Sequence, residues 1–303
     1  MTADTASARV ASPGRRLIVE VRWGASAGSK GVLEPGRVLQ VGRAETAGLS
    51  VPGDASMSEL HFELAWDGTH CTLRDLKSGT GTLLDGQRVE ESQVSHGGWV
   101  RAGMTDFSVH VEAMTPPNRP AVAELPVRKA LEARALKALV SQSGLLFAVM
   151  DAAQDARVLV LLRESVEEYR SLYDGPQGDV LAEVAPLLVS LPRDSRLLES
   201  LVQEGWGMNW GLFLTSQRPF KDVRRHLRKF LMIQDSTGQE LYFRFYDPRV
   251  LPIFLPRCSP EQLQEFFGGI DSFLMEGSAG ERLLRFSVRE RKIRRDEVSL
   301  VSA

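Results

Sequence analysis

Three short segments in the first third of the chain carry the residue types that a phosphate-binding site needs. They are Gly42-Arg43, Ser58-x-x-His61 and the run 75–82, which Asp85-Gly86 follows. The guanidinium of Arg43 is a forked cation that matches a phosphate, and the hydroxyl of Ser58 is a short donor. Glycines at 42 and 81 permit backbone turns that a Cβ would hinder. The pattern predicts a site for a phosphorylated residue, which carries close to two negative charges.

The elements that must position these segments are predicted to be short β-strands. Apolar and β-branched residues alternate in the runs 17–23, 38–41, 61–66, 71–76, 99–101 and 107–112. Turn signals such as Glu34-Pro35-Gly36 and Gly97-Gly98 separate the runs. Many short strands at close spacing predict an antiparallel β-sandwich, to which we assign residues 15–113.

In order and spacing, these segments resemble the signature of the forkhead-associated (FHA) domain from about residue 17 to residue 111. The resemblance implies a phosphopeptide site formed by Arg43, Ser58, Glu59, Gly79 and Thr80. It further implies that Gly42, His61 and Gly81 support the loops, with His61 bracing them without touching phosphate.

Two of these positions depart from the family pattern. The family usually has Arg, Lys or Asn where this chain has Glu59, and Asn where it has Thr80. A carboxylate about 6 Å from a doubly charged phosphate costs ~1–2 kcal/mol even in water. Two interpretations therefore stay open: phosphothreonine recognition, and docking of a partner without phosphate.

The composition changes at residues 114–120, which hold three prolines. We expect a semi-rigid linker over 114–126. Beyond it, helices are predicted over 127–140, 195–203, 220–230 and 260–267, and strands over 145–150, 157–162, 211–215 and 241–246. This mixture predicts a multidomain chain whose second domain, 127–288, has an α+β fold. A basic, mobile tail is expected over 289–303.

Five segments of the second domain resemble the domain of unknown function 4123 (DUF4123), whose members act as effector adaptors in bacterial type VI secretion. The segments are 146–153, 182–189, 205–211, 226–231 and 243–251. The resemblance implies a secretion effector and the spike protein of the secretion apparatus as partners. The candidate partner-binding residues are Trp206, Trp210, Lys221, Arg224, Arg225, Arg228, Arg244, Asp247 and Arg249.

Each group of candidates also has a purely structural interpretation. The two tryptophans are equally suited to the core, and the cations at 221–228 to a solvated helix face. For residues 244–249 the alternative is a structural junction between a strand and a helix, whose charged side chains pair within the domain. In it, Asp247 caps the helix and Arg244 pairs with Asp247 or Glu183.

Nothing in the sequence indicates catalysis. It contains no nucleophile–base pair, metal-ligand spacing or cofactor fingerprint, and we expect His226 to be a solvated helix residue. Cys71 and Cys258 lie far apart and are expected to be small buried hydrophobes. A net charge of -2 argues against nucleic-acid binding. No apolar run reaches the ~18 residues of a membrane span, and residues 1–13 lack a signal-peptide core.

These features predict a non-enzymatic, cytoplasmic bacterial adaptor or chaperone without cofactor or metal. On this interpretation the protein binds a type VI effector, helps to load it on the spike protein, and docks a further protein through the FHA module. The alternative is an FHA-based phosphothreonine signalling scaffold unrelated to effector loading.

Overall fold

The computed structural model describes residues 14–24, 26–117, 126–173, 181, 183–234 and 238–301. Backbone contacts divide the chain into two compact units, Met1–Met114 and Thr115–Ala303. The prediction about residues 1–13 and most of the predicted linker lie outside the described residues.

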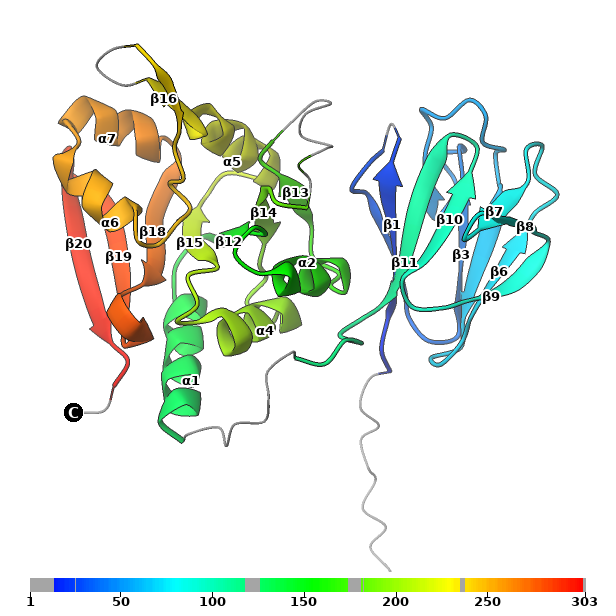
Figure 1. Cartoon of the computed structure of the whole chain (residues 1–303), viewed down its shortest axis with the longest axis horizontal. Helices are drawn as coiled ribbons and strands as arrows, with labels where there is room; N and C mark the ends of the chain where they lie inside the picture. Colours follow the sequence, from blue (N-terminus) through cyan, green and yellow to red (C-terminus); the bar gives the residue numbers. More distant parts are fainter. Residues whose placement is uncertain are drawn as a thin grey trace, which may run out of the picture. The chain divides into compact units, whose positions relative to one another are not determined.

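The first unit is a sandwich of two sheets (Figure 1). One sheet has the order β2-β1-β11-β10-β7-β8, formed by Lys30–Leu33, Leu17–Trp23, Thr105–Val111, Gly98–Ala102, Thr82–Leu84 and Gln87–Val89. The other has the order β4-β3-β5-β6-β9, formed by Leu49–Ser50, Arg37–Gly42, Phe62–Trp66, Cys71–Asp75 and Glu91–Val94. Phe62 of one sheet and Phe107 of the other meet edge to face in the core, with ring centroids 5.4 Å apart. The predicted sandwich is confirmed.

Every run predicted as a strand in the first unit falls on a strand, whereas β2, β4, β7, β8 and β9 were missed. The missed strands are only two to four residues long. Apolar and polar residues alternate with a period of two, and this pattern repeats too few times in such short strands to be detected.

The second unit is built on one antiparallel sheet with the order β13-β14-β12-β15-β18-β19-β20. These strands are Tyr169–Ser171, Pro186–Ser190, Leu145–Asp151, Gly211–Ser216, Ile270–Glu276, Arg282–Arg289 and Lys292–Ser299. A separate hairpin pairs β16, Met232–Gln234, with β17, Glu240–Tyr242.

Helices cover both faces of this sheet (Figure 1). Leu146, Ala148 and Met150 of β12 belong to one core, together with α1 (Pro126–Val140), α2 (Ala156–Arg163) and α4 (Arg196–Gly205). Phe147 and Val149 belong to the other core, with α5 (Phe220–Leu227), α6 (Leu251–Phe254) and α7 (Pro260–Phe267). Because successive strand residues point to opposite faces, β12 serves both cores. The predicted mixture of helices and strands is confirmed.

Two secondary-structure predictions for the second unit are wrong. The run 157–162 is helix α2 instead of a strand, and Asp155 caps it by accepting the N–H of Arg157. A short apolar run does not distinguish a buried strand from a buried helix. The predicted strand 241–246 ends at Tyr242. The chain then enters a turn, in which the N–H of Asp247 donates to the carbonyl of Arg244.

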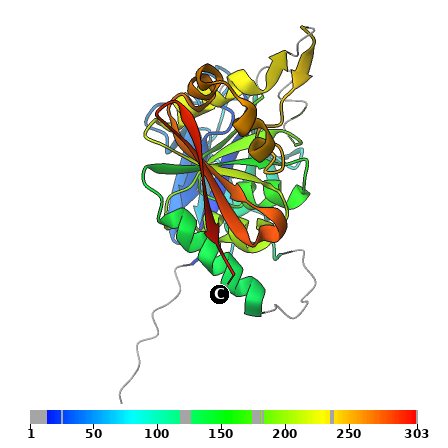
Figure 2. The same cartoon turned by 90° about the vertical axis from the view of Figure 1, so that its left-hand side faces the viewer.

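The expected mobile tail is also wrong. Residues 292–299 form β20, which pairs with β19 along its whole length. Figure 2 shows α1 beside the C-terminal end of this strand, where Arg134 donates to the carbonyl of Leu300 at 2.7 Å. Because charged residues occupy most positions of this edge strand, its sequence shows no alternation of apolar and polar residues. Charged side chains on an edge strand also protect the free edge from aggregation.

Candidate functional site

The end of β3 brings Gly42 and Arg43 against a neighbouring loop. The N–H groups of Arg43 and Ala44 donate to the carbonyls of Ser58 and Glu59 at 3.0 and 3.2 Å. A Cβ at Gly42 would collide with the Glu59 carbonyl oxygen. Only glycine permits this approach, so Gly42 fixes where Arg43 leaves the sheet.

His61 ties two loops together from a fully buried position. The N–H of Ser58 donates to Nδ1 of His61 at 3.1 Å, and Nε2 lies 3.1 Å from the carbonyl oxygen of Gly81. Since Nδ1 accepts from a backbone N–H, the ring proton must be on Nε2, which donates to Gly81. His61 thus links the loops in the way that the FHA resemblance implies.

The loop 76–81 is held by Asp75. Its carboxylate accepts hydrogen bonds from the hydroxyls of Ser78 and Thr82 at 2.6 and 2.7 Å and from the N–H of Ser78 at 3.0 Å. Burial acts to raise the pKa of Asp75, but these hydrogen bonds outweigh it and leave the pKa below its ordinary value. The Ser78 hydroxyl also accepts the N–H of Gly81 at 3.0 Å. Asp75 and Ser78 lie within the motif, but their types and spacing alone did not indicate this role.

The predicted phosphopeptide residues converge on these loops. The hydroxyl of Ser58 accepts the N–H of Gly79 at 3.0 Å, and that of Thr80 reaches the carbonyl of Ser56 at 3.4 Å. The guanidinium of Arg43 is 47% exposed and lies 3.6 Å from the carboxylate of Glu59, which is 75% exposed. The site therefore presents a solvent-facing cation whose neighbour is an acid.

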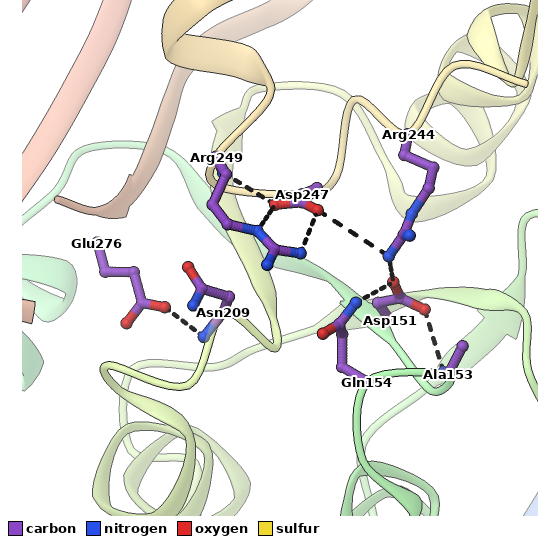
Figure 3. A network of polar contacts seen from close by, with 8 residues as sticks. All are labelled: Asp151, Ala153, Gln154, Asn209, Arg244, Asp247, Arg249 and Glu276. Carbon is purple, nitrogen blue, oxygen red and sulfur yellow. Dashed lines mark hydrogen bonds and ion pairs between the residues drawn. The ribbon is translucent and has the colours of Figure 1, made fainter. Parts of the chain in front are cut away.

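A second polar network lies in the second unit, where β12 ends beside residues 243–251 (Figure 3). Arg244 donates to the buried carboxylate of Asp151 at 2.6 Å and lies 4.0 Å from that of Asp247. Arg249 donates to both oxygens of Asp247, at 2.9 and 2.7 Å. Arg244 therefore has Asp151 as its closest partner, whereas Glu183 pairs with Arg163 at 3.2 Å.

Asp247 does not cap a helix in the way that was predicted. Helix α6 begins at Leu251 with Val250 in the cap position, while the Asp247 carboxylate accepts the N–H of Arg249 at 2.9 Å. Asp247 instead stabilises the turn before the helix. Burial acts to raise its pKa, but the hydrogen bonds from Arg249 prevail and lower it.

Glu276 is a buried carboxylate that sequence reasoning missed. It accepts the backbone N–H of Asn209, as Figure 3 shows, and that of Gly207. Both donor residues have positive φ, 55° for Asn209 and 84° for Gly207. Burial outweighs these hydrogen bonds and raises the pKa of Glu276. The carboxylate borders a pocket of about 340 Å³ that Arg249 and Arg295 also line.

Several candidate partner residues prove to be structural. Trp206 and Trp210 are buried, and the indole N–H of Trp206 donates to the carbonyl of Gly280 at 2.7 Å. They are therefore core residues and not surface anchors. Arg224 and Arg228 are half-buried and donate to backbone carbonyls of residues 171–173.

The remaining charged candidates on α5 are exposed. Lys221 faces solvent, and Arg225 pairs with Asp222 at 2.6 Å. His226 is half-buried, with Nε2 2.8 Å from the carbonyl of Phe266, so the expectation of a solvated residue is wrong.

The described parts of the chain hold no group of three or more His, Cys, Asp or Glu able to bind a metal ion. Cys71 is buried, which raises the pKa of its thiol to about 12, and burial also raises the pKa of Cys258. Among the described residues, no helix is long and apolar enough to cross a membrane.

Comparison with known proteins identifies both units. Residues 39–103 match the model of the FHA domain, and residues 146–265 match that of the domain of unknown function DUF4123. The chain therefore joins an FHA domain to a DUF4123 domain.

The relatives found correspond to the first unit. The FHA domain-containing protein FhaA of Mycobacterium tuberculosis is 34% identical over 71 residues, which are 23% of this chain and 13% of FhaA. The FhaA FHA domain in complex with the intracellular domain of Rv3910 is 29% identical, covering 31% of this chain and 99% of that chain, with a TM-score of 0.28. The FHA domain of CT664 from Chlamydia trachomatis is 24% identical, covering 31% and 96%, with a TM-score of 0.30.

Proposed function

We propose that this protein is a non-enzymatic adaptor of bacterial type VI secretion that holds an effector through its DUF4123 domain and helps to load it on the spike protein. The observation that carries the proposal is the presence of two recognition domains, FHA and DUF4123, in one chain. From the DUF4123 match we expect a secretion effector and the spike protein as partners. From the FHA match we expect a further protein that docks on the first unit. On this proposal the adaptor works in the cytoplasm.

The FHA loops support a role in phosphothreonine binding. Arg43 presents its guanidinium to solvent, and Ser58 and Gly79 lie side by side through their hydrogen bond of 3.0 Å. A charge-assisted hydrogen bond contributes about 1.5–3 kcal/mol, so three strong ones reach the ~8 kcal/mol of a micromolar complex and fewer give a weaker one. Glu59 weakens such binding and makes it dependent on salt.

The paired network of the second unit supports a contact role for one of its arginines. Arg244 is committed to Asp151, whereas Arg249 is 59% exposed and borders the pocket beside Glu276. Arg249 is therefore the more exposed of the two arginines and the better candidate for a contact with a partner protein.

Affinity purification from the producing bacterium tests the adaptor role. A tagged chain should recover an effector and the spike protein, and deletion of its gene should stop secretion of that effector. Recovery of neither protein, together with unchanged secretion, would reject the proposal.

The FHA role needs a separate test with matched variants. Arg43→Ala should abolish the binding of phosphothreonine peptides, whereas Arg37→Ala should not, because Arg37 lies at the opposite end of β3. Equal binding by the two variants would remove the phosphate role and leave phosphate-independent docking.

The fully formed FHA loops also favour the second candidate, a phosphothreonine signalling scaffold. Phosphatase treatment before purification separates the two candidates. A scaffold would lose all its partners, whereas an adaptor would retain the effector and the spike protein.

A further inference from the structure

A basic pocket of about 260 Å³ lies beside α5, away from the network of Figure 3. It is lined by Arg218, Arg225, His226 and Lys229, with Asp222 as the single carboxylate. Asp222 is already paired with Arg225 at 2.6 Å. Across the described ranges, Arg218 and Lys229 have no ion-pair partner. The pocket therefore holds excess positive charge that an anion would neutralise.

The positions of two lining side chains are fixed by the backbone. The Ser216 hydroxyl donates to the carbonyl of Gly269 at 2.6 Å and accepts the N–H of Arg218 at 3.0 Å. A Cβ at Gly269 would lie 2.9 Å from Cγ of Arg218, so the arginine stem rests on a glycine. His226 is held in the same way against Gly268. These contacts fix the stem of Arg218 and the ring of His226 at the pocket, while Arg218 as a whole stays exposed and open to a ligand.

The number of unpaired charges indicates the kind of occupant. Arg218 precedes α5, Asp222 and Arg225 lie on α5, and Lys229 lies in the short 3-10 turn Arg228–Phe230 that follows it. Two cations from two different segments are neutralised by two separate anionic groups, such as the carboxylates along an acidic peptide. The pocket is also smaller than the roughly 300–1,000 Å³ of a small-molecule site.

We propose that this groove binds an extended acidic segment of a partner protein, with carboxylates paired to Arg218 and Lys229. The inference rests on the proposed function for the partner being a protein. Of the earlier candidates, Arg225 lines this groove but is paired with Asp222, and Arg224 and Arg228 are engaged with backbone carbonyls.

Fluorescence anisotropy of the full-length protein with a labelled hexaglutamate peptide tests the proposal. The double variant Arg218→Gln/Lys229→Gln should bind at least tenfold more weakly than the unmodified chain. The matched control Lys137→Gln/Lys292→Gln removes the same charge at two exposed positions outside the groove and should stay within twofold. A hexaglutamine peptide should not bind.

The possible outcomes separate this site from its alternatives. Equal losses in the two double variants would mean non-specific attraction and would overturn the proposal. So would calorimetric binding of inorganic phosphate without binding of hexaglutamate, which would identify a small-anion site. If the double variant does not fold, Lys229→Gln alone, at an exposed position, should still weaken binding measurably. These measurements do not involve the effector or the spike protein, so they can fail while the adaptor role stands.

Discussion

Replacing Glu59 with glutamine should tighten the binding of phosphothreonine peptides. The Glu59 carboxylate lies 3.6 Å from the Arg43 guanidinium, which we expect to bind the phosphate. A phosphate oxygen hydrogen-bonded to that guanidinium at ~2.8 Å would lie within about 6 Å of the carboxylate. Glutamine keeps the size of the side chain and removes the charge.

The magnitude follows from Coulomb's law. In water, a unit charge about 6 Å from a doubly charged phosphate costs about 1.4 kcal/mol. At 0.15 M salt, where the Debye length is about 8 Å, screening roughly halves this cost. Glu59→Gln should therefore strengthen binding about threefold at physiological salt and approach tenfold at 0.01 M. The exposed ion pair with Glu59, which contributes ~0–1 kcal/mol, competes with the phosphate for the Arg43 guanidinium, so its loss acts in the same direction.

Anisotropy titrations of one phosphothreonine peptide at 0.01, 0.15 and 1 M salt would measure this effect. Glu34→Gln is the matched control, because Glu34 precedes β3 and Arg43 follows it. Six residues of strand place the control roughly 20 Å from the site, beyond the Debye length at physiological salt. If Arg43→Ala abolishes binding while Glu59→Gln gives no gain at any salt concentration, the electrostatic reasoning is refuted.

Three further predictions concern stability. Gly42→Ala should destabilise the FHA domain by about 1–3 kcal/mol in urea unfolding, because its Cβ meets the Glu59 carbonyl; an unchanged midpoint would contradict this close approach. Arg244→Ala should lower the free energy of unfolding of the second unit by about 1–2 kcal/mol, since it strips the buried Asp151 carboxylate of its cation. That loss is smaller than for a fully buried pair because Arg244 is 45% exposed. The pKa of Asp75 is lower in the folded domain than the ordinary 3.8, so its contribution is present above pH 3.8 and lost as the pH falls through the folded pKa. Asp75→Asn should flatten this acid limb of the stability profile, and an equally steep limb in the variant would count against the assignment.

The FHA site could be predicted because each of its residues does a task that few residue types can do. His61 must accept from one loop and donate to another, which requires two nitrogens on one ring. Gly42 must lack a Cβ. Such constraints leave a fixed spacing in the sequence, and the spacing is visible without coordinates. Asp75, which accepts several hydrogen bonds at once, received no role from the sequence because an aspartate at the end of a strand is common and its partners are known only from the structure.

The polar contacts of the second unit are less constrained and could not be assigned in advance. Helical spacing puts Arg224 and Arg228 on one face, but it cannot say whether solvent or a backbone carbonyl lies opposite. Asp247 and Glu183 were the two expected partners of Arg244, but the sheet brings it to a third acid, Asp151, 93 residues away. Glu276 gave no signal, because its donors are backbone N–H groups whose direction depends on the φ of Asn209.

The acid at position 59 is compatible with a useful FHA module if the chain makes two contacts at once. A second contact on the same polypeptide acts at an effective concentration that reaches the millimolar range for short flexible connections. A phosphopeptide complex weakened threefold by Glu59 is then still formed, provided that the DUF4123 domain already holds a protein of the same assembly. The weak site also releases its partner readily when the phosphate is removed, because affinity differences lie mainly in the dissociation rate. Glu59 would thus make the FHA contact dependent on simultaneous binding by the second domain. The affinity of the FHA domain for an isolated phosphopeptide would then underestimate the contribution of the FHA contact to the complex.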